Sequence, residues 1–102
     1  MRHLKNIHPG EVLKEEFLVP MDISVYCLSK VTGLSQTRLS QIIKGRRSIT
    51  AETAVKLGKF FDIAAEFWMN LQSLYDIEEA QKQYRKEIKS IYPVKELKRA
   101  IV

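Results

Sequence analysis

Apolar residues recur three and four positions apart along most of the chain, which is the spacing that gathers them on one face of a helix. These stripes predict four short helices in a compact cluster before residue 62, and a longer fifth helix from about residue 65 to residue 89. The residues expected to face the core are Leu13, Phe17, Leu39, Ile42, Ile43, Ala54, Leu57, Phe61, Phe67 and Leu71, and Leu74 continues the line of Phe67 and Leu71 along the fifth helix. The pattern therefore indicates an all-α chain, in which residues 95–102 form a final turn or an extended strap.

Capping residues mark where these helices begin and end. A hydroxyl before a helix accepts a hydrogen bond from a free backbone N–H, and glycine after a helix adopts the left-handed conformation at little cost. The predicted N-caps are Ser24, Ser35 and Thr50, and the predicted terminal glycines are Gly33 and Gly45. Pro9 opens the first helix, and Val19-Pro20 is expected to end it. Gly58, inside the fourth helix, predicts close helix packing at that point.

Residues 25–44 have the layout of two short helices joined by a tight turn. Ser29 is small enough for a second helix to cross closely, and Leu34 fills the turn. The second helix keeps polar side chains on its outward face, and the loop that follows it is basic. This is the helix-turn-helix pattern, in which the second helix enters the major groove of DNA.

The outward residues of the second helix divide into base and phosphate contacts by their chemistry. Glutamine can hydrogen bond to adenine, the threonine methyl can meet the methyl of thymine, and arginine can grip a guanine or a phosphate. The predicted base-reading residues are Gln36, Thr37, Arg38 and Gln41, and the predicted phosphate contacts are Ser35, Ser40, Lys44, Arg46 and Arg47. A solvated helix start is the alternative interpretation of the same polar residues.

Positive charge is concentrated in the same part of the chain. The formal net charge of the 102 residues is +5. Residues 24–62 carry seven basic and two acidic side chains, so this segment alone has a net charge of +5. A polyanionic partner such as DNA fits this distribution, whereas a merely soluble basic face is the alternative.

Other features argue against an enzyme, a metal or cofactor site and a membrane protein. His3 and His8 are the only histidines, and neither metal-ligand spacing nor a glycine-rich phosphate loop accompanies them. The chain has no apolar run near the roughly 18 residues that a membrane span needs, and its start lacks the apolar stretch of a secretory signal. Cys27 is the only cysteine, which indicates a cytoplasmic protein, and we expect it to be buried. With no linker or repeat, residues 1–102 are expected to form a single domain.

Three segments resemble the HigA/VapI group of antitoxins within the Xre (Cro/CI-like) helix-turn-helix family. They are residues 8–11 (HPGE) with Leu13 and residues 15–18 (EEFL), residues 45–50 (GRRSIT), and residues 66–72 (EFWMNLQ) followed by Tyr75 and Asp76. The resemblance covers residues 8–75 and implies a lambda-repressor-like core of about five helices. Residues 76–102 would then be a C-terminal helix and tail that serves dimerisation.

By this resemblance, the chain neutralises a small HigB/RelE-like toxin that cleaves mRNA, and it represses the operon that encodes both proteins. It departs from the family at two places. Val25 replaces a glutamine that many relatives use to bind a phosphate, so one backbone contact is expected to be missing or to be replaced by helix N–H groups. Thr32 replaces a larger apolar residue before the turn glycine and is expected to loosen the turn.

Operator specificity needs more base pairs than one helix reads, so we expect a two-fold dimer on an inverted repeat with half-sites about 34 Å apart. The dimer contacts expected on the fifth helix and tail are Trp68, Leu74, Tyr75, Tyr84, Ile88, Ile91 and Tyr92, of which Trp68 is also compatible with the core. Toxin binding is expected at an acidic cluster formed by Glu11, Glu15 and Glu16, because an RNA-cleaving toxin is expected to be basic. A solvated charged face is the alternative there.

A stand-alone Xre repressor, of phage type or virulence-associated, would share every DNA-reading residue and have no toxin partner. A toxin gene beside this one would distinguish the two functions. RNA binding is disfavoured, because the aromatic residues follow the buried stripes and form no exposed stacking platform.

Overall fold

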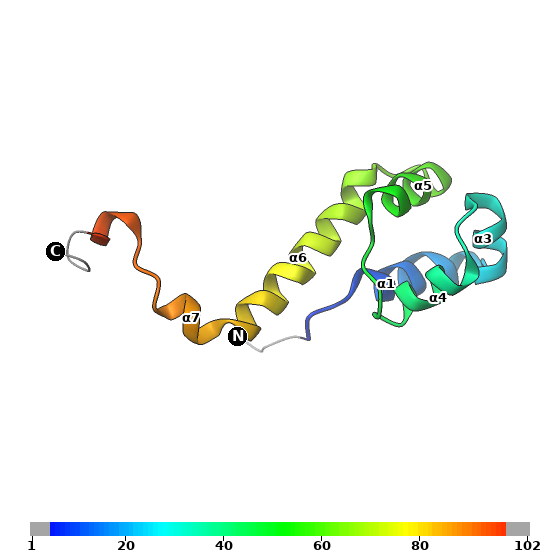
Figure 1. Ribbon diagram of the computed structural model, residues 1–102. Helices are drawn as coiled ribbons and strands as arrows, with labels where there is room; N and C mark the ends of the chain where they lie inside the picture. The colour runs from blue at the N-terminus through cyan, green and yellow to red at the C-terminus, as the bar shows by residue number, and fades with distance from the viewer. Residues whose placement is uncertain (1–4, 98–102) are drawn as a thin grey trace.

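The structure, a computed structural model, describes residues 5–97, and these residues form helices and connecting turns without a strand (Figure 1). The elements are α1 (Pro9–Val12), η1 (Leu13–Leu18), α2 (Val19–Met21), α3 (Val25–Thr32), α4 (Gln36–Ile43), α5 (Ala51–Phe61), α6 (Ala65–Gln83), α7 (Arg85–Lys89) and η2 (Val94–Glu96). The all-α prediction is therefore confirmed. The elements up to the first half of α6 gather in one cluster, and the rest of α6 leads out of it towards α7 (Figure 1).

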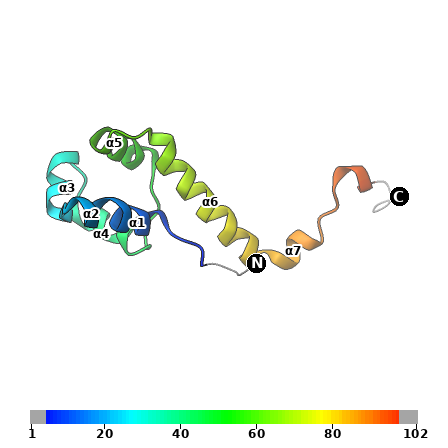
Figure 2. The same cartoon turned by 180° about the vertical axis from the view of Figure 1, so that it is seen from behind.

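The elements α1, η1 and α2 follow one another without a break and form the first helix (Figure 2). Its middle section is π-helical, and the N–H of Val19 donates to the carbonyl of Lys14, five residues back. The prediction that Val19-Pro20 ends this helix is wrong, because Pro20 lies inside the last helical turn. A widened turn makes room for a proline ring, which would otherwise crowd the preceding carbonyl. The helix ends at Asp22, whose φ of 55° is left-handed, a conformation that aspartate tolerates better than most residues.

The predicted helix caps are confirmed. The capping bonds run from the N–H of Cys27 to Ser24 Oγ at 3.0 Å, from that of Arg38 to Ser35 Oγ at 3.0 Å, and from that of Thr53 to Thr50 Oγ1 at 3.4 Å. The predicted terminal glycines, Gly33 and Gly45, have φ values of 77° and 76°. Local signals in the sequence therefore place the ends of α3, α4 and the start of α5 correctly.

The core collects apolar side chains from the first helix and from α3 to α6. Its buried members are Leu13, Leu18, Leu28, Leu34, Leu39, Ile42, Ile49, Ala54, Leu57 and Trp68. Other predicted core residues are partly buried against them, namely Phe17, Ile43, Phe61 and Leu71. The apolar stripes of the first helix and of α3, α4 and α5 are thus largely where the sequence predicts them.

The start of α6 faces the core with Trp68 and Gln72, which lie one helical turn apart. Trp68 has no exposed surface, and its ring centroid lies 5.1 Å from that of Phe17. This orientation turns Phe67 (37% exposed) and Leu74 (66% exposed) towards solvent. The prediction that Phe67 lines the core is therefore wrong, as is the assignment of Trp68 to a dimer contact, whereas exposed Leu74 remains available for the dimer contact predicted for it.

Gln72 is a buried polar residue that the sequence analysis missed. Its Oε1 accepts a hydrogen bond from the N–H of Ile49 at 2.8 Å, and its Nε2 donates to Asp76 Oδ1 at 2.9 Å. A buried backbone N–H without a partner would be costly. Gln72 therefore ties α6 to the loop before α5.

Two glycines let backbone segments come into direct contact. A Cβ on Gly10 would lie 1.7 Å from the carbonyl oxygen of Ile42, so α1 approaches the end of α4 as closely as backbone allows. A Cβ on Gly58 would lie 2.5 Å from the carbonyl oxygen of Ile63. The close packing predicted around Gly58 is thus confirmed.

Residues 76–97, here called the C-terminal arm, contain no buried residue. The prediction of one helix to residue 89 is wrong at Tyr84, where φ of −108° and ψ of 27° separate α6 from α7. The arm makes the described part of the chain elongated, with extents of 61 × 28 × 23 Å. Of the predicted final turn or strap, η2 is described, whereas residues 98–102, with Ile101, lie outside the described residues.

Candidate nucleic-acid interface

The outward face of α4 carries most of the predicted base-reading residues. The exposed ones are Gln36, Thr37 and Gln41. On the opposite face, Leu39 and Ile42 have no exposed surface. The helix therefore fixes these three polar side chains on one solvent-facing surface, because its apolar stripe holds it to the core.

Side-chain hydrogen bonds fix the turn that precedes α4. The hydroxyl of Ser29 donates to the carbonyl of Leu34 at 2.6 Å. The hydroxyl of Thr32 donates to the carbonyl of Leu28 at 2.6 Å and accepts from the N–H of Leu34 at 3.3 Å. The expectation that Thr32 loosens the turn is therefore wrong. An apolar residue at this position could not make either bond.

Arg38 differs from the other predicted base-reading residues because it has a partner within the chain. Its Nη1 lies 3.2 Å from Oε1 of Glu52, the second residue of α5. The other oxygen, Oε2, lies 2.8 Å from Nζ of Lys56. Hydrogen bonds from Lys56 and then from Arg38 lower the pKa of Glu52 below its ordinary value. The sequence analysis missed Glu52, whose spacing to Lys56 is the only local signal of this cluster.

The basic loop after α4 is held by its own backbone. The N–H of Arg46 donates to the carbonyl of Gln41 at 2.8 Å, and that of Gly45 donates to Ile42 at 2.9 Å. This pair of bonds, with left-handed Gly45, is the Schellman ending of a helix. The exposed cations of this region are Lys44, Arg46 and Arg47. They directly follow the exposed polar face of α4, as phosphate contacts beside a major-groove helix would.

His8 joins this loop to α1 and α6. Its Nδ1 accepts a hydrogen bond from the N–H of Gly10 at 2.9 Å, which caps α1. Its ring meets that of Tyr75 edge-on with centroids 4.8 Å apart, and it also packs against Gly45. Burial lowers the pKa of His8 below its ordinary value, although the charge of Asp76 acts in the opposite direction. His8 is therefore explained as a structural cap.

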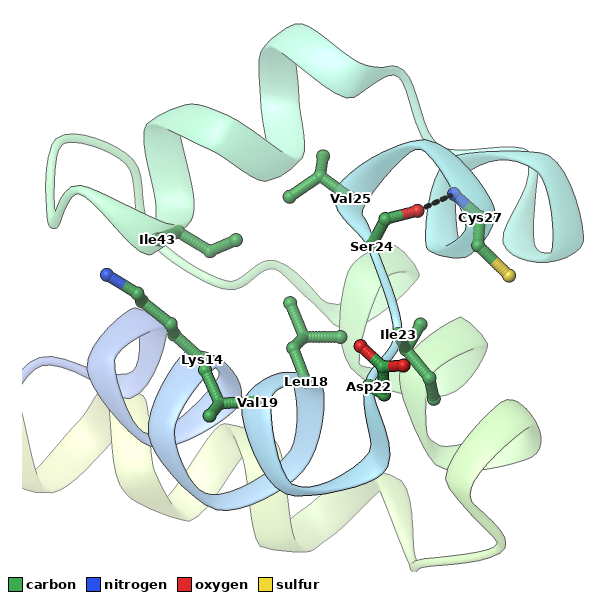
Figure 3. Close-up of a pocket in the computed structure, with 9 residues that line it drawn as sticks. All are labelled: Lys14, Leu18, Val19, Asp22, Ile23, Ser24, Val25, Cys27 and Ile43. Atoms are coloured by element: carbon green, nitrogen blue, oxygen red, sulfur yellow. Dashed lines mark hydrogen bonds between the residues drawn. The ribbon is translucent and has the colours of Figure 1, made fainter.

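A cleft of about 500 Å³ lies between the end of the first helix and the start of α3 (Figure 3). Leu18, Val25 and Ile43 line its apolar part, and Lys14 stands at one side. Val25 is half-buried against the core, so it offers no phosphate contact of the kind that glutamine provides. The expectation that Cys27 is buried is wrong, because Leu28 takes the buried position of α3 and leaves Cys27 exposed.

The predicted dimer contacts are divided among the core, the middle of α6 and the C-terminal arm. Trp68 belongs to the core, and Tyr75 is half-buried beside His8. The remaining predicted contacts are exposed, namely Leu74 (66%), Tyr84 (46%), Ile88 (45%), Ile91 (69%) and Tyr92 (61%). The structure thus leaves an apolar series that begins at Leu74 in the middle of α6 and continues on the arm.

The predicted toxin-facing carboxylates lie on the first helix. Glu15 and Glu16 are exposed on η1. Glu11 is half-buried on α1, and its Oε1 lies 3.6 Å from Nζ of Lys5. The first helix therefore presents two of the three predicted carboxylates openly to solvent.

Two further observations apply to residues 5–97 only. Within this range, no three side chains of His, Cys, Asp or Glu gather as metal ligands would. No helix described in it has the length and apolar character needed to cross a bilayer. His3 lies outside the described residues.

Comparison with known proteins finds matches over most of the chain. The family model described as "Helix-turn-helix" matches residues 14–68, more than half of the sequence. The chain is 41% identical over 88 residues to "Virulence-associated protein I" of Dichelobacter nodosus, covering 86% of this chain and 81% of that protein.

Solved structures of similar proteins extend the match to nearly their full length. One is described as "Pseudomonas aeruginosa antitoxin HigA with higBA promoter"; it is 41% identical, with a TM-score of 0.84, over 88% of this chain and 99% of that chain. Another, from Coxiella burnetii, is an addiction module antidote protein of a HigA family; it is 44% identical, with a TM-score of 0.82, over 88% of this chain and 99% of that chain. Each of these two structures therefore matches most of this chain and nearly all of its own length.

Proposed function

The chain belongs to the HigA/VapI group of antitoxins within the Xre helix-turn-helix family, and from this premise we propose that it is the antitoxin of a type II toxin–antitoxin system. In this function it binds operator DNA, represses its own operon and neutralises a HigB/RelE-like toxin that cleaves mRNA. Operator DNA as the proposed partner supports a cytoplasmic location. The proposed role is binding rather than catalysis.

The observation that carries the DNA-binding half is the surface formed by α4 and the loop after it. Gln36, Thr37 and Gln41 are exposed together on a helix whose opposite face is locked into the core. Arg46 and Arg47 follow directly on a loop with a fixed backbone. In a major groove, such a helix reads base edges while the flanking cations hold the phosphates. Support also comes from the similar HigA of Pseudomonas aeruginosa, which was solved with its promoter.

The experiment that tests this half is a binding titration of the purified chain against two DNA duplexes. One duplex comes from the promoter in front of the gene, and the other has the same base composition in scrambled order. We expect the promoter duplex to bind about 10³-fold or more tightly at physiological salt, which is the lower end of specific binding by such proteins. Equal affinity for both duplexes would refute the proposal.

We propose that the operator is bound by a dimer and that the contacts come from Leu74 on α6 and from the C-terminal arm. Leu74, Ile91 and Tyr92 are each more than half exposed, which is costly for a surface that meets only water. A two-fold pair of α4 helices on half-sites about 34 Å apart would read enough base pairs for an operator. Light scattering at micromolar concentration tests this arrangement, and Leu74→Glu is expected to lower the apparent mass towards that of one chain.

The toxin is proposed to dock on the first helix, where Glu15 and Glu16 are exposed. Complementary charge steers association with a basic partner and raises its rate. Reversing both charges to lysine is therefore expected to weaken binding of the toxin while operator binding is retained. Full neutralisation of the toxin by this double variant would rule out the docking surface.

The second candidate function is a stand-alone repressor of the same family. It needs the same surface of α4, so the DNA titration cannot distinguish it from an antitoxin. Native co-purification can, because an antitoxin carries a small basic protein encoded by the adjacent gene. Recovery of the chain without such a protein, from cells that encode no neighbouring toxin, would favour the stand-alone repressor.

A further inference from the structure

Glu52 holds two cations beside the base-reading helix. Its Oε1 lies 3.2 Å from Nη1 of Arg38, and its Oε2 lies 2.8 Å from Nζ of Lys56. Each carboxylate oxygen thus takes one cation. Arg38 belongs to α4, whereas Glu52 belongs to α5, so the pair crosses from one helix to another.

The same carboxylate lies beside one of the predicted phosphate contacts, Arg47. A hollow of about 390 Å³ is lined by Arg38, Arg47, Ser48 and the start of α5 with Glu52. It therefore brings together a predicted base-reading residue, a predicted phosphate contact and one acidic side chain. A negative charge at this place opposes the approach of DNA phosphates, whose attraction dominates binding to any sequence.

The ion pair between Arg38 and Glu52 is expected to contribute little to the stability of the fold. The side chains of Arg38 and Glu52 are 32% and 54% exposed, and exposed ion pairs contribute little to folding. A carboxylate in the first turn of a helix interacts favourably with the helix dipole. Glu66, also the second residue of its helix, has this interaction without an ion pair within residues 5–97. Glu52 differs from Glu66 in holding two cations, and of these two only Arg38 lies on the base-reading helix.

We propose that Glu52 is a positioning residue that sets the DNA selectivity of Arg38, an inference that rests on the proposed operator binding. By holding Nη1, Glu52 orders a long side chain before DNA arrives, and other N–H donors of the guanidinium are left for a base. By its charge, it cancels part of the attraction of Arg38 and Lys56 for phosphates. The first effect strengthens operator binding, and the second weakens binding to other sequences.

The test compares Glu52→Gln with the matched control Glu66→Gln. Both variants remove one carboxylate at the second residue of a helix, and both add the same positive increment to the net charge. Fluorescence anisotropy measures the affinity of each for the promoter duplex and for the scrambled duplex between about 50 and 200 mM salt, the range over which phosphate contacts are resolved. Thermal melts verify that both variants fold.

We expect Glu52→Gln to lose about threefold on the promoter duplex and to gain about threefold on the scrambled one, so that selectivity falls about tenfold. The salt dependence on scrambled DNA should become steeper by about 0.9 for each cation released to a phosphate. Glu66→Gln should leave the selectivity unchanged. A parallel change on both duplexes, or the same change in both variants, would overturn the proposal, because Glu52 would then act as charge alone.

A second background tests whether Glu52 acts through Arg38. In Arg38→Gln, the further change Glu52→Gln should alter selectivity by less than about twofold, since the positioned group is gone. A tenfold fall in that background would place the effect on Lys56 and overturn the inference. If the unmodified chain shows no preference for its promoter, the proposed function fails. If it shows the preference and Glu52→Gln retains all of it, only this inference fails.

Discussion

Gly10 is the residue whose replacement the structure opposes most directly. In a helix, Gly→Ala normally stabilises by about 1 kcal/mol, because alanine loses less backbone freedom on folding. Here a Cβ would lie 1.7 Å from the carbonyl oxygen of Ile42, 2.5 Å from its carbonyl carbon and 2.9 Å from Cα of Ile43. All three atoms are backbone of the end of α4. No side chain can rotate to relieve the clash, so α1 and α4 must separate.

The expected cost follows from that separation. Inserting a methyl group into a packed core costs about 1–3 kcal/mol and occasionally more. Because the clashing atoms of α4 are backbone atoms, we expect Gly10→Ala to lower the free energy of unfolding by about 3 kcal/mol or more. For a chain of this size, that corresponds to a fall in melting temperature of roughly 12 °C or more. Urea denaturation gives the free energy of unfolding, and a thermal melt gives the temperature.

The control is Gly33→Ala, which separates steric clash from backbone strain. Gly33 has a left-handed φ of 77° and nothing within 4 Å of a Cβ, so only the strain of about 1–2 kcal/mol applies. Gly10→Ala should therefore be clearly the more damaging of the two. A Gly10→Ala variant as stable as the parent chain, or more stable than Gly33→Ala, would refute the packing of α1 on α4 described above.

Three further predictions concern the DNA surface, the cap of α1 and the core. In an electrophoretic shift assay, Arg46→Ala/Arg47→Ala should weaken binding to all DNA sequences and reduce the slope of log affinity against log salt by about 0.9 per lost phosphate contact. Gln36→Ala should instead cost about 1–3 kcal/mol of binding free energy on the promoter and little on scrambled DNA. Equal losses on both DNAs would contradict the role of Gln36. Because the pKa of His8 is lower in the folded chain, its contribution to stability is fully present above the unfolded pKa of about 6.5 and is lost as the pH falls through the folded pKa. The urea midpoint should therefore decrease below pH 6.5. His8→Asn should make this decrease smaller. In urea denaturation, Trp68→Phe should lower the free energy of unfolding by about 0–1.5 kcal/mol and Trp68→Ala by about 3–5 kcal/mol. The phenyl ring keeps most of the packing, and the substitution to Phe removes an indole N–H that has no hydrogen-bond partner in the described part of the chain. Equal losses in the two variants would contradict this account.

Local signals account for the parts of the fold that the sequence analysis predicted correctly. Ser24, Ser35 and Thr50 cap helices through backbone N–H groups three residues away, and Gly33 and Gly45 end helices through their own backbone freedom. These energies depend on neighbours in the sequence, so they can be recognised without a structure. The exposed face of α4 follows from them, because two fixed ends and one apolar stripe determine which side chains point outward.

The rotation of α6 and the two side-chain partners that the sequence analysis missed involve contacts between distant segments. Residues 67–69 are all apolar, and a helix can rotate by one residue without losing its stripe, so periodicity alone did not identify Trp68 as the buried one. The burial of Gln72 depends on an N–H of Ile49, 23 residues away, and the partner of Arg38 lies 14 residues away on another helix. Such pairs form only when packing sets the angles between helices. The sequence therefore sufficed for the helix-turn-helix unit, whereas the rotation of α6, the contact of Gly10 with α4 and the role of Glu52 depend on how the packed helices meet.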